Sequence, residues 1–241
     1  MNTALIFAGG SGQRMNTRTL PKQFLELNGK PIIIHTIENF ENHPQIDAIL
    51  VVCIEEWIPY LRGLLEKYHI QKVKWITAGG DTGQQSIRNG LQLLWSDPLV
   101  PEDAIILIHD GVRPLINAGV ISQNIACAEQ YGNAVTVTPA TETIINVSEN
   151  GEVSNILDRS ICQMARAPQT FRLSDIIDAH KKAEADGNID MIDSAMLMTR
   201  YGTVLHVVEG PFENIKITTP VDFYIFRAVY EARENSQIWG I

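Results

Sequence analysis

The stretch most suggestive of chemistry lies near the N-terminus, where residues 5 to 24 read LIFAGGSGQRMNTRTLPKQF. An apolar run ends at Ala8, and the glycines that follow let backbone N–H groups approach phosphate oxygens without a Cβ in the way. Arg14 and Lys22 stand eight residues apart on the same loop, a spacing at which two cations can clamp a triphosphate. The stretch predicts a polyphosphate-binding loop; the alternative is a solvated surface Arg and Lys.

Two other kinds of phosphate-binding loop match this stretch poorly. A Walker P-loop needs Lys-Ser or Lys-Thr after its last glycine, and neither follows here. The dinucleotide fingerprint G-x-G-x-x-G would have Met15 at its third glycine, and Pro21 delays the helix that should begin at the loop. An NAD-dependent oxidoreductase is therefore disfavoured.

Further charged residues follow later apolar runs. In IILIHDGVRP, Asp110 can bind a ribose hydroxyl or Mg²⁺, while Arg113 can hold a phosphate or pair with Asp110. The alternative is a purely structural Asp–Arg pair beside a turn. Lys216 lies on an expected short strand between Ile215 and Ile217, so it points away from both, toward solvent or a site.

The elements that must position these residues alternate along the chain. Apolar runs predict strands at 4–8, 48–54, 73–77, 104–109, 134–138 and 204–208. Spacing near 3.6 residues predicts helices at 31–40, 57–68, 82–95, 118–131, 174–185 and 220–233. This alternation indicates an α/β fold, with a mainly parallel sheet covered on both faces and ligands at the carboxyl ends of its strands.

Residues 141–160 break this rhythm. Asn150-Gly151 lies between β-rich runs, which is a strong hairpin signal. The segment is too polar for the centre of a parallel sheet. It is expected to be either a surface hairpin or an arm that pairs with a second subunit, and we favour the arm.

Composition limits the class of protein. The chain has 241 residues, 45% of them hydrophobic, enough for one large domain with a sizeable core. A net charge of −9 disfavours nucleic-acid binding, and neither a membrane span nor a signal peptide is expected. Three widely spaced cysteines, Cys53, Cys127 and Cys162, suit a reducing cytoplasm and are expected to be buried, inert thiols.

AGGSGQRM…PKQF resembles the signature of CTP-dependent cytidylyltransferases that act on small polyol phosphates. Two branches fit: the 2-C-methyl-D-erythritol 4-phosphate enzyme of isoprenoid synthesis and the ribitol 5-phosphate enzyme of teichoic acid or capsule synthesis. The resemblance covers essentially the whole chain, because further motifs recur in the family's order. They are GGD at 79–81 with Ser86, HDGVRP at 109–114, the arm with Arg159, APQTF at 167–171, Asp193 and ENIKITTPVDF at 213–223.

The resemblance implies a Rossmann-like nucleotidyltransferase sheet over a single domain, 1–241, with the 141–160 arm serving a homodimer. It implies transfer of CMP from CTP to a polyol phosphate, with Mg²⁺ as cofactor and Asp110 as its ligand. Catalytic roles fall to Arg14, Lys22 and Lys216. Nucleotide binding falls to Ala8, Gly9, Gly10, Ser11, Gly12, Gly80, Asp81, Ser86, Asp110 and Gly111, and acceptor binding to Arg113, Thr143, Arg159, Arg166 and Asp193.

The chain departs from the family pattern where the acceptor should bind. Two positions at which the family usually has threonine are Ala167 and Ile192, and Arg166 stands beside the first. A lost hydroxyl leaves its partner unpaired, whereas an arginine can offer a charge-assisted contact to phosphate. Another sugar or polyol phosphate of surface-polymer synthesis is therefore an alternative acceptor. A non-catalytic nucleotide-binding subunit is a second alternative, which the joint retention of Arg14, Lys22, Asp110 and Lys216 disfavours.

Overall fold

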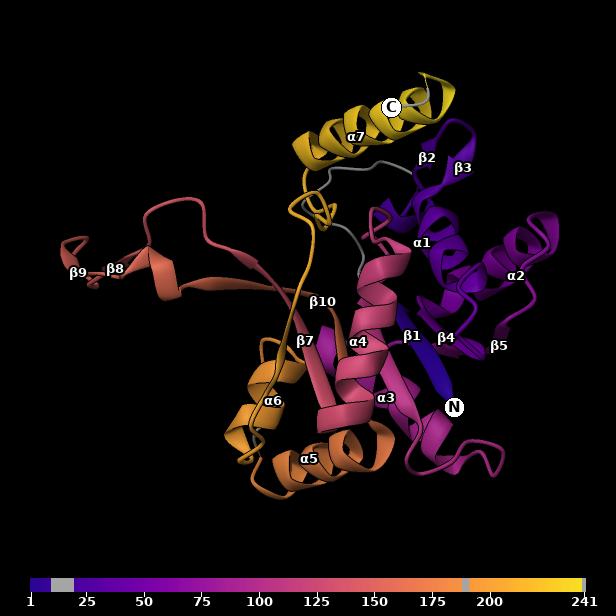
Figure 1. The fold of residues 1–241 in the computed structure, drawn as a ribbon. Helices are drawn as coiled ribbons and strands as arrows, with labels where there is room; N and C mark the ends of the chain where they lie inside the picture. The colour runs from indigo at the N-terminus through magenta and orange to yellow at the C-terminus, as the bar shows by residue number, and fades with distance from the viewer. Residues whose placement is uncertain (10–19, 188–190, 240–241) are drawn as a thin grey trace.

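The structure is a computed structural model that describes residues 1–9, 20–187 and 191–239 (Figure 1). Within these ranges, seven strands form one sheet in the order β11-β7-β10-β6-β1-β4-β5. The strands are β1 (Asn2–Ala8), β4 (Ala48–Cys53), β5 (Val73–Ala78), β6 (Ile105–Asp110), β7 (Asn133–Pro139), β10 (Gln163–Arg172) and β11 (Val207–Glu209).

The centre of the sheet is parallel. β1 pairs in parallel with both β4 and β6, β5 pairs in parallel with β4, and β11 with β7. The central strands are continuous apolar runs because both of their faces are covered. Phe7 of β1 lies opposite Asp110 of β6, so the two strands end together at one edge. This confirms the predicted α/β fold with a mainly parallel sheet.

Helices cover both faces of the sheet and divide the core in two. Apolar side chains of α1, α2 and α4 pack on one face, and those of α3, α5 and α6 on the other. A third cluster joins α7 to the start of α1 and to the loop after β6. The helices are α1 (Ile32–Glu41), α2 (Ile58–Lys67), α3 (Gly83–Ser96), α4 (Ala118–Tyr131), α5 (Leu173–Ala185), α6 (Ser194–Arg200) and α7 (Pro220–Trp239).

Local sequence explains several of the helix ends. The Thr82 side chain accepts a hydrogen bond from the Gln85 backbone N–H and so caps α3, the helix beside the candidate site. Asn117 caps α4 in the same way, and Gly132 ends that helix in the left-handed conformation at φ +83°. At the start of α7, Thr219 and Asp222 form a reciprocal capping box.

The predicted hairpin is present and leaves the body of the protein. Strands β8 (Ile145–Val147) and β9 (Val153–Ile156) pair antiparallel around Gly151, which has φ +82°. Figure 1 shows this hairpin extending away from the ends of β7 and β10. The remaining short elements are the β2–β3 pair (Glu26–Leu27 and Lys30–Pro31) and the 3₁₀ turns η2 (Lys22–Phe24), η3 (Glu55–Trp57) and η4 (Arg159–Ile161).

The structure corrects three details. β10, antiparallel to both its neighbours, and the short helix α6 were not predicted. The segment around Lys216 is not a strand: Ile217 N–H donates to the Val112 carbonyl, but no ladder of bonds follows. Cys53 is buried, whereas Cys127 and Cys162 are only partly so. No described helix is both long and apolar enough to span a membrane.

Candidate active site

Two cavities lie side by side at the carboxyl ends of β1 and β6, each about 270 Å³ in volume. The loop cavity contains Lys22, Gly80 and Ser86 in its wall, and the arginine cavity contains Arg113 and Arg166. Both are also lined by Phe7, Gly83, Asp110 and Lys216. Because the cavities share this wall, together they form one groove with Asp110 and Lys216 at its middle.

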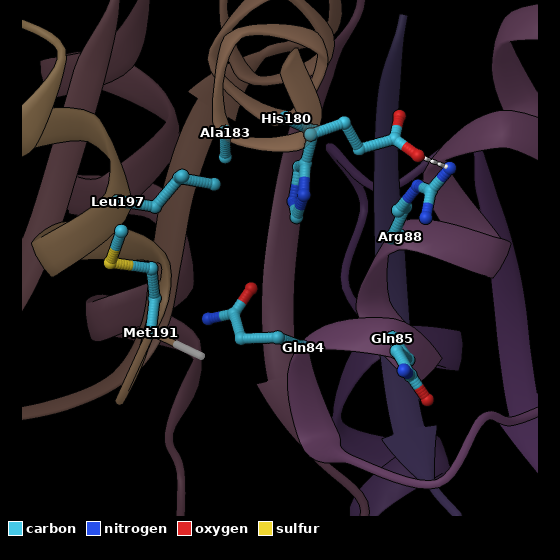
Figure 2. Close-up of a pocket in the computed structure, with 8 residues that line it drawn as sticks. Gln84, Gln85, Arg88, His180, Ala183, Met191 and Leu197 are labelled. Atoms are coloured by element: carbon cyan, nitrogen blue, oxygen red, sulfur yellow. Dashed lines mark ion pairs between the residues drawn. The ribbon is translucent and has the colours of Figure 1, made fainter. Parts of the chain in front are cut away.

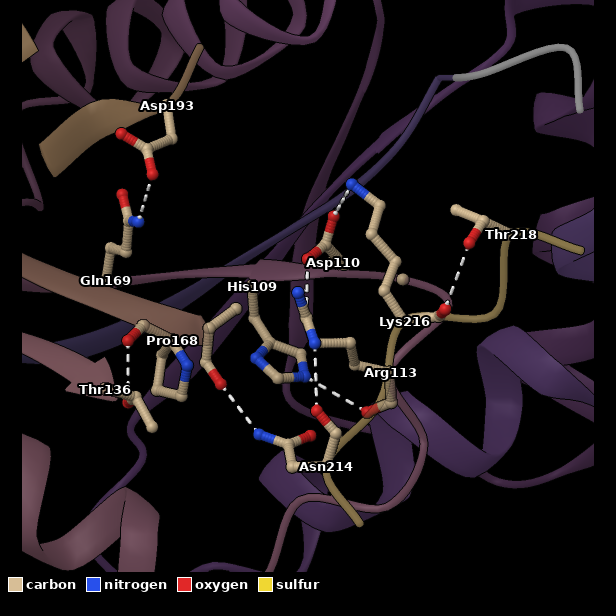
Figure 3. Close-up of polar contacts among 12 residues, drawn as sticks. His109, Asp110, Arg113, Thr136, Pro168, Gln169, Asp193, Asn214, Lys216 and Thr218 are labelled. Atoms are coloured by element: carbon tan, nitrogen blue, oxygen red, sulfur yellow. Dashed lines mark hydrogen bonds and ion pairs between the residues drawn. The ribbon is translucent and has the colours of Figure 1, made fainter. Parts of the chain in front are cut away.

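Asp110 organises the middle of the groove. One carboxylate oxygen, Oδ2, accepts a hydrogen bond from Arg113 Nε at 2.8 Å, and the other, Oδ1, lies 2.5 Å from Lys216 Nζ (Figure 3). The Asp110 and Arg113 side chains are buried, whereas the Lys216 side chain is 39% exposed. Lys216 Nζ also lies 5.7 Å from the centre of the Phe7 ring. The lysine therefore presents its charge to both cavities while the acid stays covered.

The charge state of Asp110 follows from these contacts. Burial by itself would raise the pKa of its carboxyl group, but the charges and hydrogen bonds of Arg113 and Lys216 outweigh that effect and lower the pKa to about 2. Asp110 is therefore ionised at neutral pH. The three side chains carry a net charge of +1, which favours an anion in the groove.

The loop after β6 is fixed by contacts of its own backbone and side chains. The Arg113 guanidinium donates a second hydrogen bond, from Nη1 to the Asn214 carbonyl at 2.8 Å. His109 Nε2 lies 3.1 Å from the Arg113 carbonyl oxygen, and burial lowers the His109 pKa to about 4, so the ring is neutral and donates this bond. Asn214 in turn donates to the Ala167 carbonyl at 2.8 Å. Arg113 is thus linked through Asn214 to Ala167, another residue that lines the arginine cavity.

The loop cavity gathers the predicted nucleotide-binding residues that the structure describes. Ala8 ends β1 and Gly9 follows it, Lys22 begins η2, Gly80 and Asp81 come from the turn between β5 and α3, and Ser86 comes from the first turn of α3. Gln23 donates from Nε2 to the Ala8 carbonyl at 2.6 Å, which ties η2 to the end of β1. Lys22 is therefore brought to the same cavity as the β5–α3 turn.

The Ser86 side chain forms hydrogen bonds with the backbone of the β5–α3 turn. Its Oγ accepts from the Gly80 backbone N–H at 3.0 Å and donates to the Thr82 carbonyl at 2.9 Å. A Cβ added at Gly9 or Gly79 would lie 2.9 or 2.8 Å from Ser86 Oγ, closer than real Cβ atoms approach. Glycine at these two positions therefore lets the two loops meet around the hydroxyl of Ser86.

The arginine cavity contains two more of the predicted acceptor-binding residues. Arg166 Nε donates to Thr138 Oγ1 at 3.3 Å, and its guanidinium lies 5.8 Å from the centre of the Phe212 ring. Asp193 caps α6 by accepting from the Met196 N–H, and it also accepts from Gln169 Nε2 at 2.9 Å. Arg166 thus offers a cation to the cavity, while Asp193 holds its wall in place.

Some predicted residues are not brought to the groove. Thr143 and Arg159 are exposed on or beside the hairpin and line neither cavity. Gly111 packs against β1, where its N–H donates to the Phe7 carbonyl, and it also lines neither cavity. Gly10, Ser11, Gly12 and Arg14 lie outside the described residues.

Sequence reasoning missed Gln84, Gln169, Ser194 and Phe7, all of which line the arginine cavity. Gln84 lies between Asp81 and Ser86, which were assigned to the nucleotide, and next to Gln85, whose side-chain oxygen accepts from the Asp81 N–H. The capping pattern Asp193-Ser194-x-Met196 was the available signal for α6. Gln169 stands in the APQTF motif at 167–171, but the motif gave it no role, because its position depends on the pairing of β10.

Comparison with known proteins places the chain in a family. Residues 2–232 match the family model "IspD: 2-C-methyl-D-erythritol 4-phosphate cytidylyltransferase". Ribitol-5-phosphate cytidylyltransferase of Streptococcus agalactiae serotype III is 52% identical over 241 residues, covering 100% of both chains. The 2-C-methyl-D-erythritol 4-phosphate cytidylyltransferase of Syntrophus aciditrophicus is 38% identical, covering 96% of this chain and 97% of its own.

The fold agrees with a solved structure as well. The crystal structure of 4-diphosphocytidyl-2C-methyl-D-erythritol synthase from Anaerococcus prevotii matches with a TM-score of 0.82 at 24% identity, covering 95% of this chain and 96% of that one. The family match spans nearly the whole sequence, and the two relatives exceed 30% identity over almost their full lengths. The chain therefore belongs to the IspD family of cytidylyltransferases and is a nucleotidyltransferase.

Proposed function

We propose that this enzyme transfers CMP from CTP to ribitol 5-phosphate, giving CDP-ribitol and pyrophosphate. The observation that carries the proposal is the groove, in which Asp110 and Lys216 stand between a loop cavity and an arginine cavity. A reaction between two anionic substrates needs such a shared cation. Ribitol 5-phosphate is preferred because four relatives of that name are 50–52% identical, whereas three methylerythritol relatives are 38–41% identical.

The loop cavity is proposed to hold CTP. Lys22 enters it from one side, and the backbone of the β5–α3 turn, shaped by Ser86, from the other. Gly80 and Asp81 would lie at the base and ribose, with Ala8 and Gly9 at the triphosphate. Gly10, Ser11, Gly12 and Arg14 remain predictions for the same triphosphate, with Arg14 as a second cation beside Lys22. Gly111 is proposed to act indirectly, by packing the Asp110 loop against β1.

The arginine cavity is proposed to hold the acceptor. An acceptor phosphate oxygen attacks the α-phosphorus of CTP; a new P–O bond forms as the bond to the bridging oxygen of the β-phosphate breaks, and pyrophosphate leaves with that electron pair. The attacking phosphate is already anionic, so the reaction needs no general base. Lys216 stabilises charge at the α-phosphoryl oxygens, and Lys22 does so from the loop cavity. Arg166 attracts the acceptor phosphate, while Arg113 holds Asp110 in place.

Mg²⁺ is the divalent cation that we propose for this reaction. The described residues contain no cluster of three or more metal-ligating side chains, and Asp110 is a single carboxylate with each oxygen on a cation. One carboxylate with spare lone pairs fits an ion that takes most of its ligands from substrate phosphates and water. When bound, Mg²⁺ would neutralise part of the triphosphate charge.

The hairpin is proposed to be a dimerisation arm of a single domain, 1–241. Its side chains Ile145, Val147, Val153 and Ile156 are all large, apolar and exposed in the isolated chain. An isolated two-stranded hairpin is marginally stable, so a partner that covers it would stabilise it. Thr143 and Arg159 lie on this arm, away from the groove of their own chain. They are proposed to bind the acceptor phosphate in the partner's groove.

The proposal is tested by pyrophosphate release with Mg²⁺ and CTP against ribitol 5-phosphate, 2-C-methyl-D-erythritol 4-phosphate and a panel of sugar phosphates. Turnover is expected with ribitol 5-phosphate and CTP but not with UTP or ATP. A Lys182→Ala variant, altered on α5 outside the groove, should keep this turnover. Turnover with a different acceptor would correct the substrate, and CTP binding without turnover of any acceptor would favour a non-catalytic subunit.

A further inference from the structure

Gln84 carries a buried amide that has no hydrogen-bond partner among the residues that the structure describes. Its side chain is 7% exposed, and neither Nε2 nor Oε1 makes a hydrogen bond with any described residue. Leaving such a group unpaired in a protein interior is costly, so it marks a place where something else completes the bonding. Gln84 lines the arginine cavity, which is the proposed acceptor site.

Ser194 shows the same feature on the opposite wall. It is 1% exposed, its Oγ has no hydrogen-bond partner among the described residues, and it lines the same cavity. Its position is fixed from both sides, because Asp193 caps α6 and Gln169 Oε1 accepts from the Ala195 N–H at 2.9 Å. The cavity wall therefore fixes the position of the Ser194 hydroxyl, but no described residue forms a hydrogen bond with it.

Gln84 also borders a smaller cavity of about 70 Å³ between α3, α5 and α6. Figure 2 shows the Gln84 amide and the His180 ring extending into this space, toward Met191 and Leu197. His180 Nε2 is likewise buried without a partner among the described residues. Gln84 therefore stands between the arginine cavity and this smaller space, whose wall combines the polar side chains of Gln85, Arg88, His180 and Glu184 with the apolar Ala183, Met191 and Leu197.

The side chains that line the arginine cavity can make two kinds of contact with the acceptor. Arg113, Arg166 and Lys216 are cations, which suit a phosphate. Gln84 and Ser194 are neutral, and each can both donate and accept a hydrogen bond, which suits the hydroxyl groups of a polyol. With Ala167 and Ile192 at the two positions where the family usually has threonine, Ser194 carries the only hydroxyl among the described residues that line this cavity.

We infer that Gln84 and Ser194 are specificity-determining residues that bind hydroxyl groups of the acceptor chain. The inference rests on the proposed function. It adds which part of the acceptor, phosphate or hydroxylated chain, each group of side chains binds. A site with buried polar groups aimed at substrate hydroxyls discriminates against an acceptor that lacks them, because those groups then stay unpaired. A hydroxylated chain is therefore preferred to a deoxygenated one of the same length.

The test compares Gln84→Met and Ser194→Ala with the wild type in steady-state kinetics. Gln84→Met keeps the length of the side chain and removes its hydrogen bonds. Each variant is expected to raise the KM for ribitol 5-phosphate about tenfold and to leave the KM for CTP within about twofold; tenfold corresponds to about 1.4 kcal/mol. Gln92→Met, an exposed position on the same helix, is the matched control and should change neither constant.

Two further readouts separate acceptor recognition from a structural role. The Tm of Gln84→Met without substrates should not fall, since the amide it removes has no partner within residues 1–9, 20–187 and 191–239. With acceptor analogues that lack one hydroxyl each, the penalty of a variant should disappear for the hydroxyl that its side chain contacts. An unchanged acceptor KM in both variants, or equal rises in both KM values with a lower Tm, would overturn the inference while the proposed function stands. Absence of polyol-phosphate turnover by the wild type would overturn both.

Discussion

Replacing Asp110 by asparagine tests the electrostatics at the middle of the groove. The substitution keeps the size of the side chain but leaves Arg113, whose side chain is 10% exposed, without its counter-charge. The Asp110 pKa of about 2, against an ordinary 3.8, corresponds to roughly 2 kcal/mol of stabilisation at neutral pH. The substitution also leaves the buried charge of Arg113 unpaired, which adds to this cost. Asp110→Asn is therefore expected to lower the free energy of unfolding at pH 7 by about 2–4 kcal/mol.

The pH dependence gives this prediction its sign. The folded pKa of Asp110 lies below the unfolded one, so its contribution is complete above pH 3.8 and is lost as the pH falls toward 2. Urea unfolding of wild type and variant between pH 7 and pH 3 should show a gap that is constant down to about pH 4 and narrows below it. Asp103→Asn, an exposed change, should stay within about 0.5 kcal/mol of the wild type. Equal stability at pH 7, or a gap that does not narrow in acid, would refute the reasoning.

Three other changes probe the reaction, the core and the arm. Lys216→Met should lower kcat by about 10²–10³, measured as pyrophosphate release, while the variant still folds; a loss confined to the KM for CTP would contradict a transition-state role. Burial and the nearby Arg88 lower the His180 pKa to about 4, so its stabilisation is present above pH 6.5 and is lost as the pH falls toward 4. His180→Gln should therefore reduce the change of Tm with pH between pH 6.5 and pH 4. An unchanged slope of Tm against pH would exclude His180 as the source of that change. Ile145→Asp with Ile156→Asp should give monomers by sedimentation and reduce turnover, because the charges lie on the exposed apolar arm; a dimer of unchanged affinity would move the interface elsewhere.

The parts of the fold that could be predicted are those whose signals are local. The helix over 118–131 was predicted with the bounds that the structure has, because Asn117 caps it and Gly132 ends it. The hairpin around Asn150-Gly151 was predicted from its turn residues and the β-rich runs on either side of them. At the site, the alternation around Lys216 placed its charge away from the buried Ile217, and the structure agrees in this, although no strand forms there.

The parts that were missed depend on contacts distant in sequence. β10 pairs regularly with β6 and pairs with β7 across a break in register between Ala165 and Gln169, which no short window of sequence reveals. Gln169 acquires its role only when this pairing brings it to Asp193. The contact of Lys216 with Asp110 likewise joins residues more than 100 positions apart, so sequence could suggest each residue but not their shared carboxylate.

The long strand β10 has a consequence for how this protein can diverge. It begins at Gln163 beside the arm and runs through Arg166 and Gln169 in the cavity wall to Arg172 at the start of α5. A shift in the position of the arm would therefore move the same strand that carries Arg166 and Gln169 in the wall of the proposed acceptor cavity. With subunits paired through the arm as proposed, gene duplicates that acquire a new acceptor through changes in β10 would at the same time alter how their subunits pair. The two duplicates would then differ both in the acceptor they prefer and in the subunit they pair with, so they would form few mixed dimers.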